Sequence, residues 1–276
     1  MRAFSAAEAA GITGAGLCGF PGATFSGISY DSRNIRGGNL FVAVKGEKAD
    51  GRDYVDAAFA NGASVAISPS AMTPPEGRAL LVAPSPGESI RALARKARED
   101  FKGTVIGVVG SAGKTTTKDF SARFLSLLGP TFASGGNRNN LLGLPEMILN
   151  ADEHAKFWVL EMGISQPSEM DDLAPVASPN AVLFTSIRPV HTEFFPSLTA
   201  IRDEKVKVLK YLRKPSFYIY NADDELLAEL PRSFREKNFS YGSAPGADLR
   251  ITRIEGVGEK GFAIELSCGR DVVPVR

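Results

Sequence analysis

The sequence predicts an α/β protein in which a small mixed α/β N-terminal domain precedes a domain built on a mainly parallel sheet. Three observations support this prediction. From Gly103 onward, apolar runs alternate with helical segments, which is the pattern of strand–helix–strand units. Residues 1–85 instead contain short apolar runs separated by turn residues, with room for one or two helices. A glycine-rich turn at residues 110–113 runs directly from an apolar strand into a helix.

The N-terminal domain is predicted to occupy residues 1–101. Short apolar runs, glycine pairs and prolines mark its elements. The expected elements are, in order, a strand over Leu40–Val44 after the glycine pair at 37–38, a helix over Tyr54–Asn61, a strand over Ser64–Ile67, a proline-interrupted segment over 74–86 and a helix over Glu88–Phe101. The domain boundary is placed at the end of that last helix.

The second domain is predicted to occupy residues 102–276. Its apolar runs predict strands over Val105–Val109, Phe157–Glu161, Ala181–Ser186 and Phe217–Tyr220. The segments between them predict helices over Thr115–Leu128, Leu144–Leu149 and Leu198–Leu212. Residues 248–255 and 261–266 predict an antiparallel hairpin that edges or closes the sheet.

The composition excludes several classes of protein. The chain has 276 residues, a net charge of +1 and well-mixed acidic and basic residues, so nothing indicates a nucleic acid or an anionic membrane as partner. Its two cysteines form no disulfide framework and favour a reducing compartment. The N-terminus lacks the continuous apolar core of a signal peptide, and no run approaches the length needed to span a bilayer. We therefore expect a cytoplasmic protein that is a monomer.

Residues 104–117 have the order that a phosphate-binding loop requires. Gly110 and Gly113 let successive backbone N–H groups turn toward one anion, and the helix that follows adds its positive end. Lys114 would reach the outer phosphates, and the Thr115 hydroxyl would bind Mg²⁺. The strict spacing has a glycine where this chain has Val108. The loop predicts that the protein binds a nucleoside triphosphate.

Polar residues follow the other predicted strands, and ligands of open parallel sheets bind just beyond those strand ends. Glu161 could complete a Mg²⁺ site begun by Thr115, or cap a helix. His191 could bind a metal or a phosphate, or be a loop histidine satisfied by its own surroundings. The amides of residues 137–140 either cap local backbone or hold the phosphate and carboxylate groups of a substrate.

The chain resembles the Mur ligase family. The motifs that carry the resemblance occur in the family's order: Gly110–Lys118, Asn137–Pro145, Glu161–Gly163, His191–Glu193, Lys205 and Asn221–Asp224. The N-terminal part is similar to the family's uridine-nucleotide-binding domain, through Ser29–Arg33, Leu40–Val44, Gly46 and Asp50-Gly51.

The resemblance implies a role for each matched residue. The residues implied to bind ATP are Gly110, Ser111, Ala112, Gly113, Lys114, Thr115, Thr116, Asn221 and Asp224, the last two near the adenosine. The implied metal-binding residues are Thr115, Glu161, His191 and Lys205, and the implied catalytic residues are Lys114, Glu161, His191 and Lys205. The residues implied to bind the UDP-linked substrate are Ser29, Asp31, Ser32, Arg33, Asn137, Asn139 and Asn140.

Lys205 would bind Mg²⁺ only as a carbamate, since the family's matching lysine is carbamylated by CO₂. Carbamylation needs a neutral amine, which burial or nearby cations can supply by lowering the lysine pKa. From the residues alone, the alternative is a solvated lysine within the basic run over 205–210.

Members of the family are ATP-dependent enzymes that form amide bonds in peptidoglycan synthesis. The phosphate-binding loop and Glu161–Gly163 resemble the branch that adds D-alanyl-D-alanine to a UDP-muramoyl-tripeptide. The alternatives are a related ligase that adds a diamino acid or lysine to a UDP-muramoyl-dipeptide, or a nucleotide-binding module without catalysis. The implied partners are a UDP-muramoyl-peptide and D-Ala-D-Ala.

The chain differs from the usual family pattern at two positions and in length. Arg188 stands where the family usually has glycine, and Ser168-Glu169 where it has Gly-Glu. Family members also continue into a third domain that holds the acceptor. The resemblance therefore implies that the domain over 102–276 is incomplete at its end and that a C-terminal acceptor domain is absent. We expect residues 1–276 alone to make little product.

Overall fold

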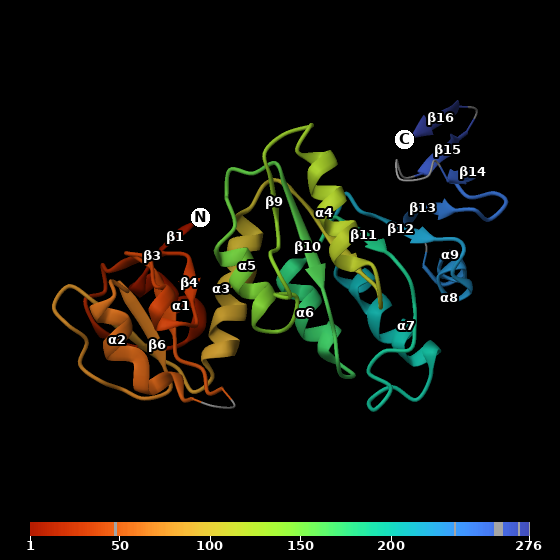
Figure 1. Cartoon of the computed structure of the whole chain (residues 1–276). Coiled ribbons are helices and arrows are strands. Elements are labelled where there is room, and N and C mark those ends of the chain that lie inside the picture. The colour runs from red at the N-terminus through yellow and green to blue at the C-terminus, as the bar shows by residue number, and fades with distance from the viewer. Residues whose placement is uncertain (47–48, 235, 257–261, 270, 276) are drawn as a thin grey trace. The chain divides into compact units, whose positions relative to one another are not determined.

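The computed structural model describes residues 1–46, 49–234, 236–256, 262–269 and 271–275 (Figure 1). Its contacts divide the chain into two compact units. The first comprises Met1–Gly103, Leu128–Trp158 and Pro175–Ala177, and the second comprises Thr104–Leu127, Val159–Ala174 and Ser178–Arg276. The domain boundary placed between residues 101 and 102 stays a prediction.

The first unit contains a five-stranded sheet with the order β2-β7-β6-β5-β4. Four strands, β4 to β7, are parallel to their neighbours, and β2 runs antiparallel to β7. Its strands are β2 (Gly16–Gly19), β4 (Ile28–Ser29), β5 (Leu40–Val42), β6 (Val65–Ser68) and β7 (Ala79–Val82). The unit also contains the small antiparallel pair β1 (Ala3–Ser5) and β3 (Thr24–Ser26), and the residues of the strand β9 (Thr131–Ala133), which is not part of this five-stranded sheet. This is the mixed α/β arrangement that the sequence predicts.

Helices of the first unit begin and end at residues suited to those positions. Ser5 caps α1 (Ala6–Thr13) by accepting a hydrogen bond from the Glu8 N–H, and Gly14 ends it in the left-handed conformation. The remaining helices are α2 (Val55–Ala60), α3 (Pro86–Asp100), α5 (Gly143–Leu149) and the 3₁₀ turns η1 (Ser32–Asn34) and η2 (Gly51–Tyr54). Helix α1 was not predicted, because its alanine-rich sequence has no clear apolar stripe.

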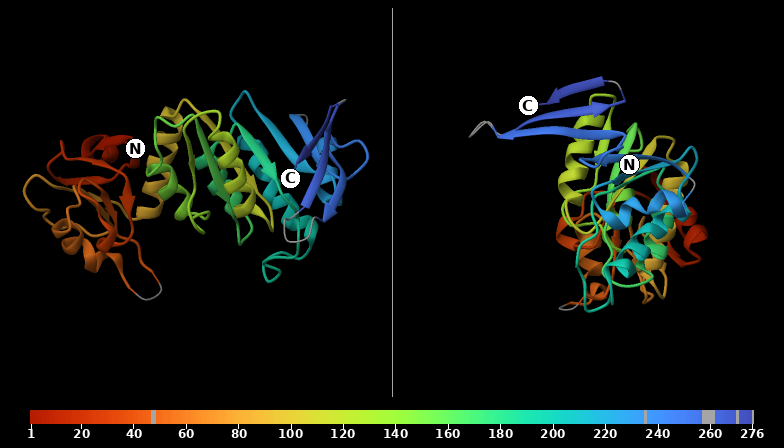
Figure 2. Two further views of the ribbon diagram at one scale, coloured as in Figure 1. Left: turned by 45° about the horizontal axis from the view of Figure 1, so that its top comes forward. Right: turned by 90° about the vertical axis from the view of Figure 1, so that its right-hand side faces the viewer.

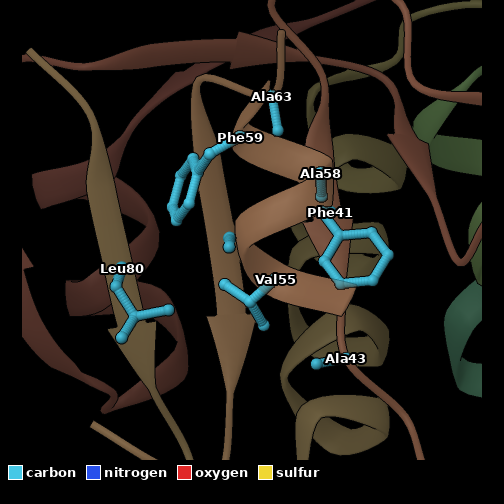
Figure 3. Packing of buried hydrophobic residues seen from close by; sticks show 8 residues of the cluster. Phe41, Ala43, Val55, Ala58, Phe59, Ala63 and Leu80 are labelled. Carbon is cyan, nitrogen blue, oxygen red and sulfur yellow. The ribbon is translucent and has the colours of Figure 1, made fainter. Parts of the chain in front are cut away.

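An apolar cluster fills the space between α2 and the sheet of the first unit. Phe41, Val55, Phe59 and Leu80 pack together there, each at most 6% exposed (Figure 3). Removing this much apolar surface from water is the main stabilising contribution to a sheet of short strands.

The second unit is built on a mainly parallel sheet whose strands follow the order β16-β15-β14-β13-β12-β11-β8-β10. Strands β8, β11, β12 and β13 pair in parallel, and β14, β15 and β16 form an antiparallel meander, drawn in blue in Figure 2. The strands are β8 (Thr104–Val109), β10 (Phe157–Met162), β11 (Ala181–Phe184), β12 (Phe217–Asn221), β13 (Lys237–Gly242), β14 (Leu249–Gly256), β15 (Phe262–Cys268) and β16 (Asp271–Val275). The predicted parallel sheet and terminal hairpin are confirmed; Gly261, at the predicted start of one hairpin strand, lies outside the described residues.

The helices of the second unit depart from prediction at several places, and two of these departures have a clear physical reason. They are α4 (Lys114–Leu125), α6 (Glu169–Ala177), α7 (Leu198–Val206), η3 (Lys207–Tyr211), α8 (Glu225–Ala228) and α9 (Leu230–Ser233). The helix predicted to reach Leu212 is α-helical only to Val206 and tightens into a 3₁₀ turn, a common helix ending, before Pro215. Helix α6 was missed because Pro175 lies inside it, although Met170, Leu173 and Ala174 have helical spacing and are fully buried.

Candidate active site

The phosphate-binding loop joins β8 to α4 through two glycines that no other residue could replace without strain. Gly113 has a φ of 79°, the left-handed region that favours glycine. At Gly110 a Cβ would overlap Thr185 Oγ1 and lie 3.1 Å from the Ser186 backbone nitrogen. Gly110 is therefore required because the end of β11 approaches the loop backbone closely.

Two hydrogen bonds hold the loop against the residues that follow β11. The Ser111 N–H donates to the Ser186 carbonyl at 2.7 Å, and Thr185 Oγ1 donates to the Ala112 carbonyl at 2.7 Å. The Ser111 hydroxyl oxygen is buried and makes no hydrogen bond within the described part of the chain. The loop is thus held in shape by protein contacts, while one hydroxyl remains available for a ligand.

Thr115 and Glu161 meet, as the sequence predicts for a shared metal site. Thr115 Oγ1 donates to Glu161 Oε2 at 2.7 Å, and Glu161 is only 3% exposed. A hydroxyl and a carboxylate are the hard oxygen donors that Mg²⁺ prefers. The donor chemistry of this pair therefore fits a Mg²⁺ ion.

Lys205 lies on α7 and is 2% exposed. Its pKa is lowered to about 8, mainly by burial and also by the positive charge of Lys114, while Glu204 opposes the shift. At physiological pH a larger fraction of this amine is neutral than of an ordinary lysine, and the neutral amine is the form that reacts with CO₂.

Glu204 is a buried carboxylate that the sequence reasoning missed. It is 5% exposed, accepts a hydrogen bond from the Met170 N–H at 3.0 Å and pairs with Lys207 at 2.8 Å. These contacts join the start of α6 to α7, and so fix the backbone that presents Lys205. Nothing in the sequence indicates a buried carboxylate here, because Glu204 stands in the charged stretch over 202–207.

His191 is exposed and adopts a left-handed φ of 53°. Its carbonyl accepts hydrogen bonds from the Phe194 and Phe195 N–H groups at 2.9 and 3.2 Å, so its backbone forms a tight turn. No contact recorded among the described residues joins its imidazole to Glu161 or Lys205. The same residues contain no group of three His, Cys, Asp or Glu side chains placed to hold a metal, but the predicted ligand set includes only two residues of those types. The role of His191 stays a prediction.

Asn221 and Asp224 lie at the end of β12, and both are bonded to the protein. Asn221 Nδ2 donates to the Thr185 carbonyl at 3.2 Å. Asp224 is buried, and its oxygens accept the Ile187 and Leu227 N–H groups at 2.8 and 3.2 Å. These bonds fasten the residues after β11 to the end of β12. Their contact with an adenosine stays a prediction.

Four of the residues predicted to bind the UDP-linked substrate follow β4 or lie in it. Asp31 binds Arg33 through two side-chain hydrogen bonds of 2.9 and 2.7 Å, which hold the pKa of Asp31 at about 2. Ser29 Oγ donates to the Asp31 carbonyl at 2.9 Å, and Ser32 is buried. A cavity of about 820 Å³ opens beside Asp31, Ser32 and Arg33. Its other lining residues include Tyr54 and Asn61, which sequence reasoning missed.

The loop over 137–140 lies in the same unit, and its three asparagines differ in their surroundings. Asn140 Oδ1 accepts the Leu142 and Gly143 N–H groups at 3.2 and 2.8 Å, which is the local capping alternative. Asn137 is exposed, and Asn139 is half-buried. Tyr30 Oη donates to the Leu142 carbonyl at 3.1 Å, which ties this loop to the residues after β4. Substrate binding by the three asparagines stays a prediction.

Two descriptions of protein families match parts of this chain. Residues 108–268, more than half of the chain, match the family description Mur ligase middle domain, and residues 24–90 match Mur ligase family, catalytic domain. The chain belongs to the Mur ligase family. The first matched range includes the glycine-rich loop over 110–113, and the second includes Ser29, Asp31, Ser32 and Arg33.

Individual Mur ligases resemble the chain over most of its length. The UDP-N-acetylmuramoyl-tripeptide–D-alanyl-D-alanine ligase of Bacillus subtilis (strain 168) is 35% identical over 226 residues, 82% of this chain and 49% of that protein. MurF from Acinetobacter baumannii superposes with a TM-score of 0.90 at 27% identity, covering 100% of this chain and 61% of that structure. MurF from Thermotoga maritima in complex with ADP gives 0.79 at 30% identity, covering 91% and 57%.

The chain spans about half the length of the curated Mur ligases that it matches. None of the helices in the described residues is both long and apolar enough to cross a membrane.

Proposed function

We propose that the chain is the nucleotide-binding and UDP-substrate-binding part of an ATP-dependent ligase that joins D-Ala-D-Ala to UDP-N-acetylmuramoyl-tripeptide. The observation that carries the proposal is the hydrogen bond between Thr115 and Glu161 beside a phosphate-binding loop, in a chain of this family. The similar ligases named for this reaction, and the likeness to MurF bound to ADP, support the choice of substrates.

The nucleotide would bind at the loop between β8 and α4. Backbone N–H groups of residues 110–113 and the start of α4 would face the phosphates, and the Ser111 hydroxyl, buried without a partner among the described residues, would gain one. Lys114 would add a charge-assisted contact with the outer phosphates. We place the adenosine beside Asn221 and Asp224.

The proposed reaction moves the γ-phosphoryl group of ATP onto the free carboxylate of the tripeptide. The bond between the γ-phosphorus and the bridging oxygen breaks, a bond to the carboxylate oxygen forms, and ADP leaves. The amine of D-Ala-D-Ala then attacks the acyl carbon, a proton is lost and phosphate departs. Lys114 and the loop N–H groups stabilise the charge that develops, so no side-chain nucleophile is needed.

Mg²⁺, when bound, would neutralise phosphate charge. We propose Thr115, Glu161, His191 and a carbamylated Lys205 as the residues that hold it. The hydrogen bond between Thr115 and Glu161 and the lowered pKa of Lys205 support this assignment. For His191 the support is its position in the family motif.

The UDP-linked substrate would bind in the cavity beside Asp31, Ser32 and Arg33. The cavity volume of about 820 Å³ falls in the range of small-molecule sites. Residues 1–101 would then form the substrate-binding domain and residues 102–276 the ATP-binding domain of a monomeric cytoplasmic enzyme.

Trapping the acyl phosphate with hydroxylamine tests the proposal, because this small nucleophile needs no acceptor site. Incubation of residues 1–276 with Mg·ATP and UDP-N-acetylmuramoyl-tripeptide should give a hydroxamate that mass spectrometry detects. The Lys114→Ala variant should give none. The UDP-muramoyl-dipeptide, donor of the related ligase that adds a diamino acid, is the matched control.

Each of the other outcomes would contradict a specific part of the proposed function. Hydroxamate formed from the dipeptide and not the tripeptide would assign the chain to the related ligase. Binding of nucleotide and tripeptide without hydroxamate would leave a binding module and refute catalysis by these residues. Equal ADP affinity of wild type and Lys114→Ala, measured by calorimetry, would refute the loop as the nucleotide site.

A further inference from the structure

Arg188 occupies a position in the second unit that the described reaction does not use. It follows β11 at the same end of the sheet as the phosphate-binding loop, and the family usually has glycine there. The backbone around it is held firmly. Ile187 is 2% exposed, and its N–H donates to Asp224 Oδ2 at 2.8 Å. Pro189 follows, which fixes its own φ and restricts Arg188 to extended conformations.

The Arg188 guanidinium is largely uncommitted. Its side chain is 60% exposed, and Nη1 donates to the Ile187 carbonyl at 3.2 Å. Nη1 also lies 3.6 Å from Asp224 Oδ2, which is too far for a hydrogen bond. Within the part of the chain that the structure describes, no other contact of this side chain is recorded. Arginine carries five N–H donors, so four remain open to a ligand.

Asp224 does not need the guanidinium to satisfy its carboxylate. Each of its oxygens already accepts one backbone N–H, from Ile187 and from Leu227. The pair between Arg188 and Asp224 is therefore a weak, partly exposed contact, which an anion with more oxygens can displace.

The residues before Arg188 contact the phosphate-binding loop directly. The Ser186 carbonyl accepts the Ser111 N–H at 2.7 Å, and Thr185 donates to the Ala112 carbonyl. Arg188 is two residues beyond Ser186, so their Cα atoms lie within about 7 Å of each other. Asn221, which bonds to Thr185, flanks the same edge at the end of β12. The Arg188 backbone thus follows residues that contact the loop, and its guanidinium lies beside Asp224, which follows β12.

We propose that Arg188 is a nucleotide-binding residue whose guanidinium leaves Asp224 and contacts the polyphosphate. This inference rests on the proposed nucleotide site. A guanidinium matches phosphate oxygens with two parallel N–H groups, whereas the glycine usual in the family offers no side chain. Arg188 would therefore supply an anion contact in addition to those of the loop and Lys114.

Calorimetry with Mg·ADP and with adenosine tests the proposal. Arg188→Gln should weaken ADP binding about tenfold, the loss expected for one charge-assisted contact, and Arg188→Gly should do the same. Adenosine has no phosphate, so it should bind wild type and variants equally. Its weak binding can be measured by ligand-observed NMR. Arg188→Lys should recover part of the loss because it restores the charge but not the paired donors.

Arg123→Gln is the matched control. It removes the same charge from an exposed arginine nine residues beyond Lys114 along α4, or about 14 Å of helix. This variant should bind ADP as wild type does. Thermal unfolding should show that all three Arg188 variants remain folded, since the side chain that they change is exposed.

The other outcomes each overturn the inference. Unchanged ADP affinity in Arg188→Gln would show that the side chain is only solvated. An equal loss for ADP and adenosine would show that Arg188 contacts the base or ribose and not the phosphates. An equal loss of ADP affinity in Arg123→Gln would show that the effect comes from the net charge of the protein and not from a contact of Arg188. Failure of the wild type to bind ADP would refute the proposed function itself, a result distinct from any change between variants.

Discussion

Replacing Gly110 with alanine should destabilise the second unit through a single contact with Thr185. An added Cβ would overlap Thr185 Oγ1 and lie 3.1 and 3.2 Å from the Ser186 backbone N and O. The Thr185 hydroxyl cannot turn away without losing its 2.7 Å hydrogen bond to the Ala112 carbonyl. The substitution therefore forces either a backbone shift in the loop or the loss of the bond that holds it.

The expected size of the effect follows from these contacts. Forcing a methyl group into a packed site costs about 1–3 kcal/mol, and losing the hydrogen bond costs about 1 kcal/mol. We expect Gly110→Ala to lower the free energy of unfolding by about 3 kcal/mol. In a Thr185→Ala background the obstructing oxygen is absent, while the tight approach to Ser186 and the positive φ of 156° at Gly110 remain. The same substitution should then cost about 2 kcal/mol less than in wild type, and this difference is the expected coupling.

Urea unfolding followed by far-UV circular dichroism, on wild type, both single variants and the double variant, measures this coupling. Gly113→Ala is the control: its φ of 79° carries a strain of about 1–2 kcal/mol, but the nearest Thr185 atom would lie 4.0 Å away. Its cost should therefore be the same with and without Thr185. Additivity of Gly110→Ala and Thr185→Ala to within about 0.5 kcal/mol would refute the argument.

Three further predictions concern buried polar groups near the loop. In calorimetry, Mg²⁺ should raise the ADP affinity of wild type more than that of Glu161→Gln. The reason is that a neutral amide binds the cation less well than a carboxylate, although it can still accept the hydrogen bond from Thr115. The pKa of Lys205 is about 8, below its usual 10.5, so between these pH values the unfolded chain binds more protons than the folded one. In CO₂-free buffer the free energy of unfolding should therefore rise from pH 8 to 10.5. Lys205→Met should abolish this rise and stabilise the protein at pH 7 by up to about 3 kcal/mol. Asp224→Ala leaves the Ile187 N–H unpaired in a buried site and should cost about 2–3 kcal/mol in urea unfolding, whereas unchanged stability would mean that water replaces the carboxylate.

The parallel sheet could be predicted from sequence because most residues of its central strands β8 and β11 are buried, on both faces of the sheet. Such strands read as continuous apolar runs, and β8, β11 and β12 were all found within a few residues of their observed ends. Elements without that pattern were missed. Strand β13 has the mixed sequence Lys-Asn-Phe-Ser-Tyr-Gly, and only its parallel pairing with β12 makes it a strand. Tertiary pairing decides such segments, and local sequence does not.

The part of the candidate site that could be predicted follows from one geometric rule, that the carboxyl ends of neighbouring parallel strands share an edge. It brought Thr115 to Glu161 correctly. The rule gives proximity, but it does not say which partner each polar group takes. Asn221 and Asp224 were predicted as ligand groups, yet their amide and carboxylate already bond to the backbone of residues 185 and 187.

These backbone bonds explain why a glycine-rich loop can be rigid before it binds anything. The loop has no side chain at Gly110 or Gly113, so its shape must come from its neighbours. Thr185 and Ser186 hold it directly. Asn221 and Asp224 in turn hold the residues around those two, so polar groups at the ends of β11 and β12 act together as a support. A loop supported in this way pays little conformational entropy on binding a phosphate chain. The bonds that these groups make between the loop, the end of β11 and the end of β12 join residues 36 to 75 positions apart in the chain, and no local pattern in the sequence encodes them.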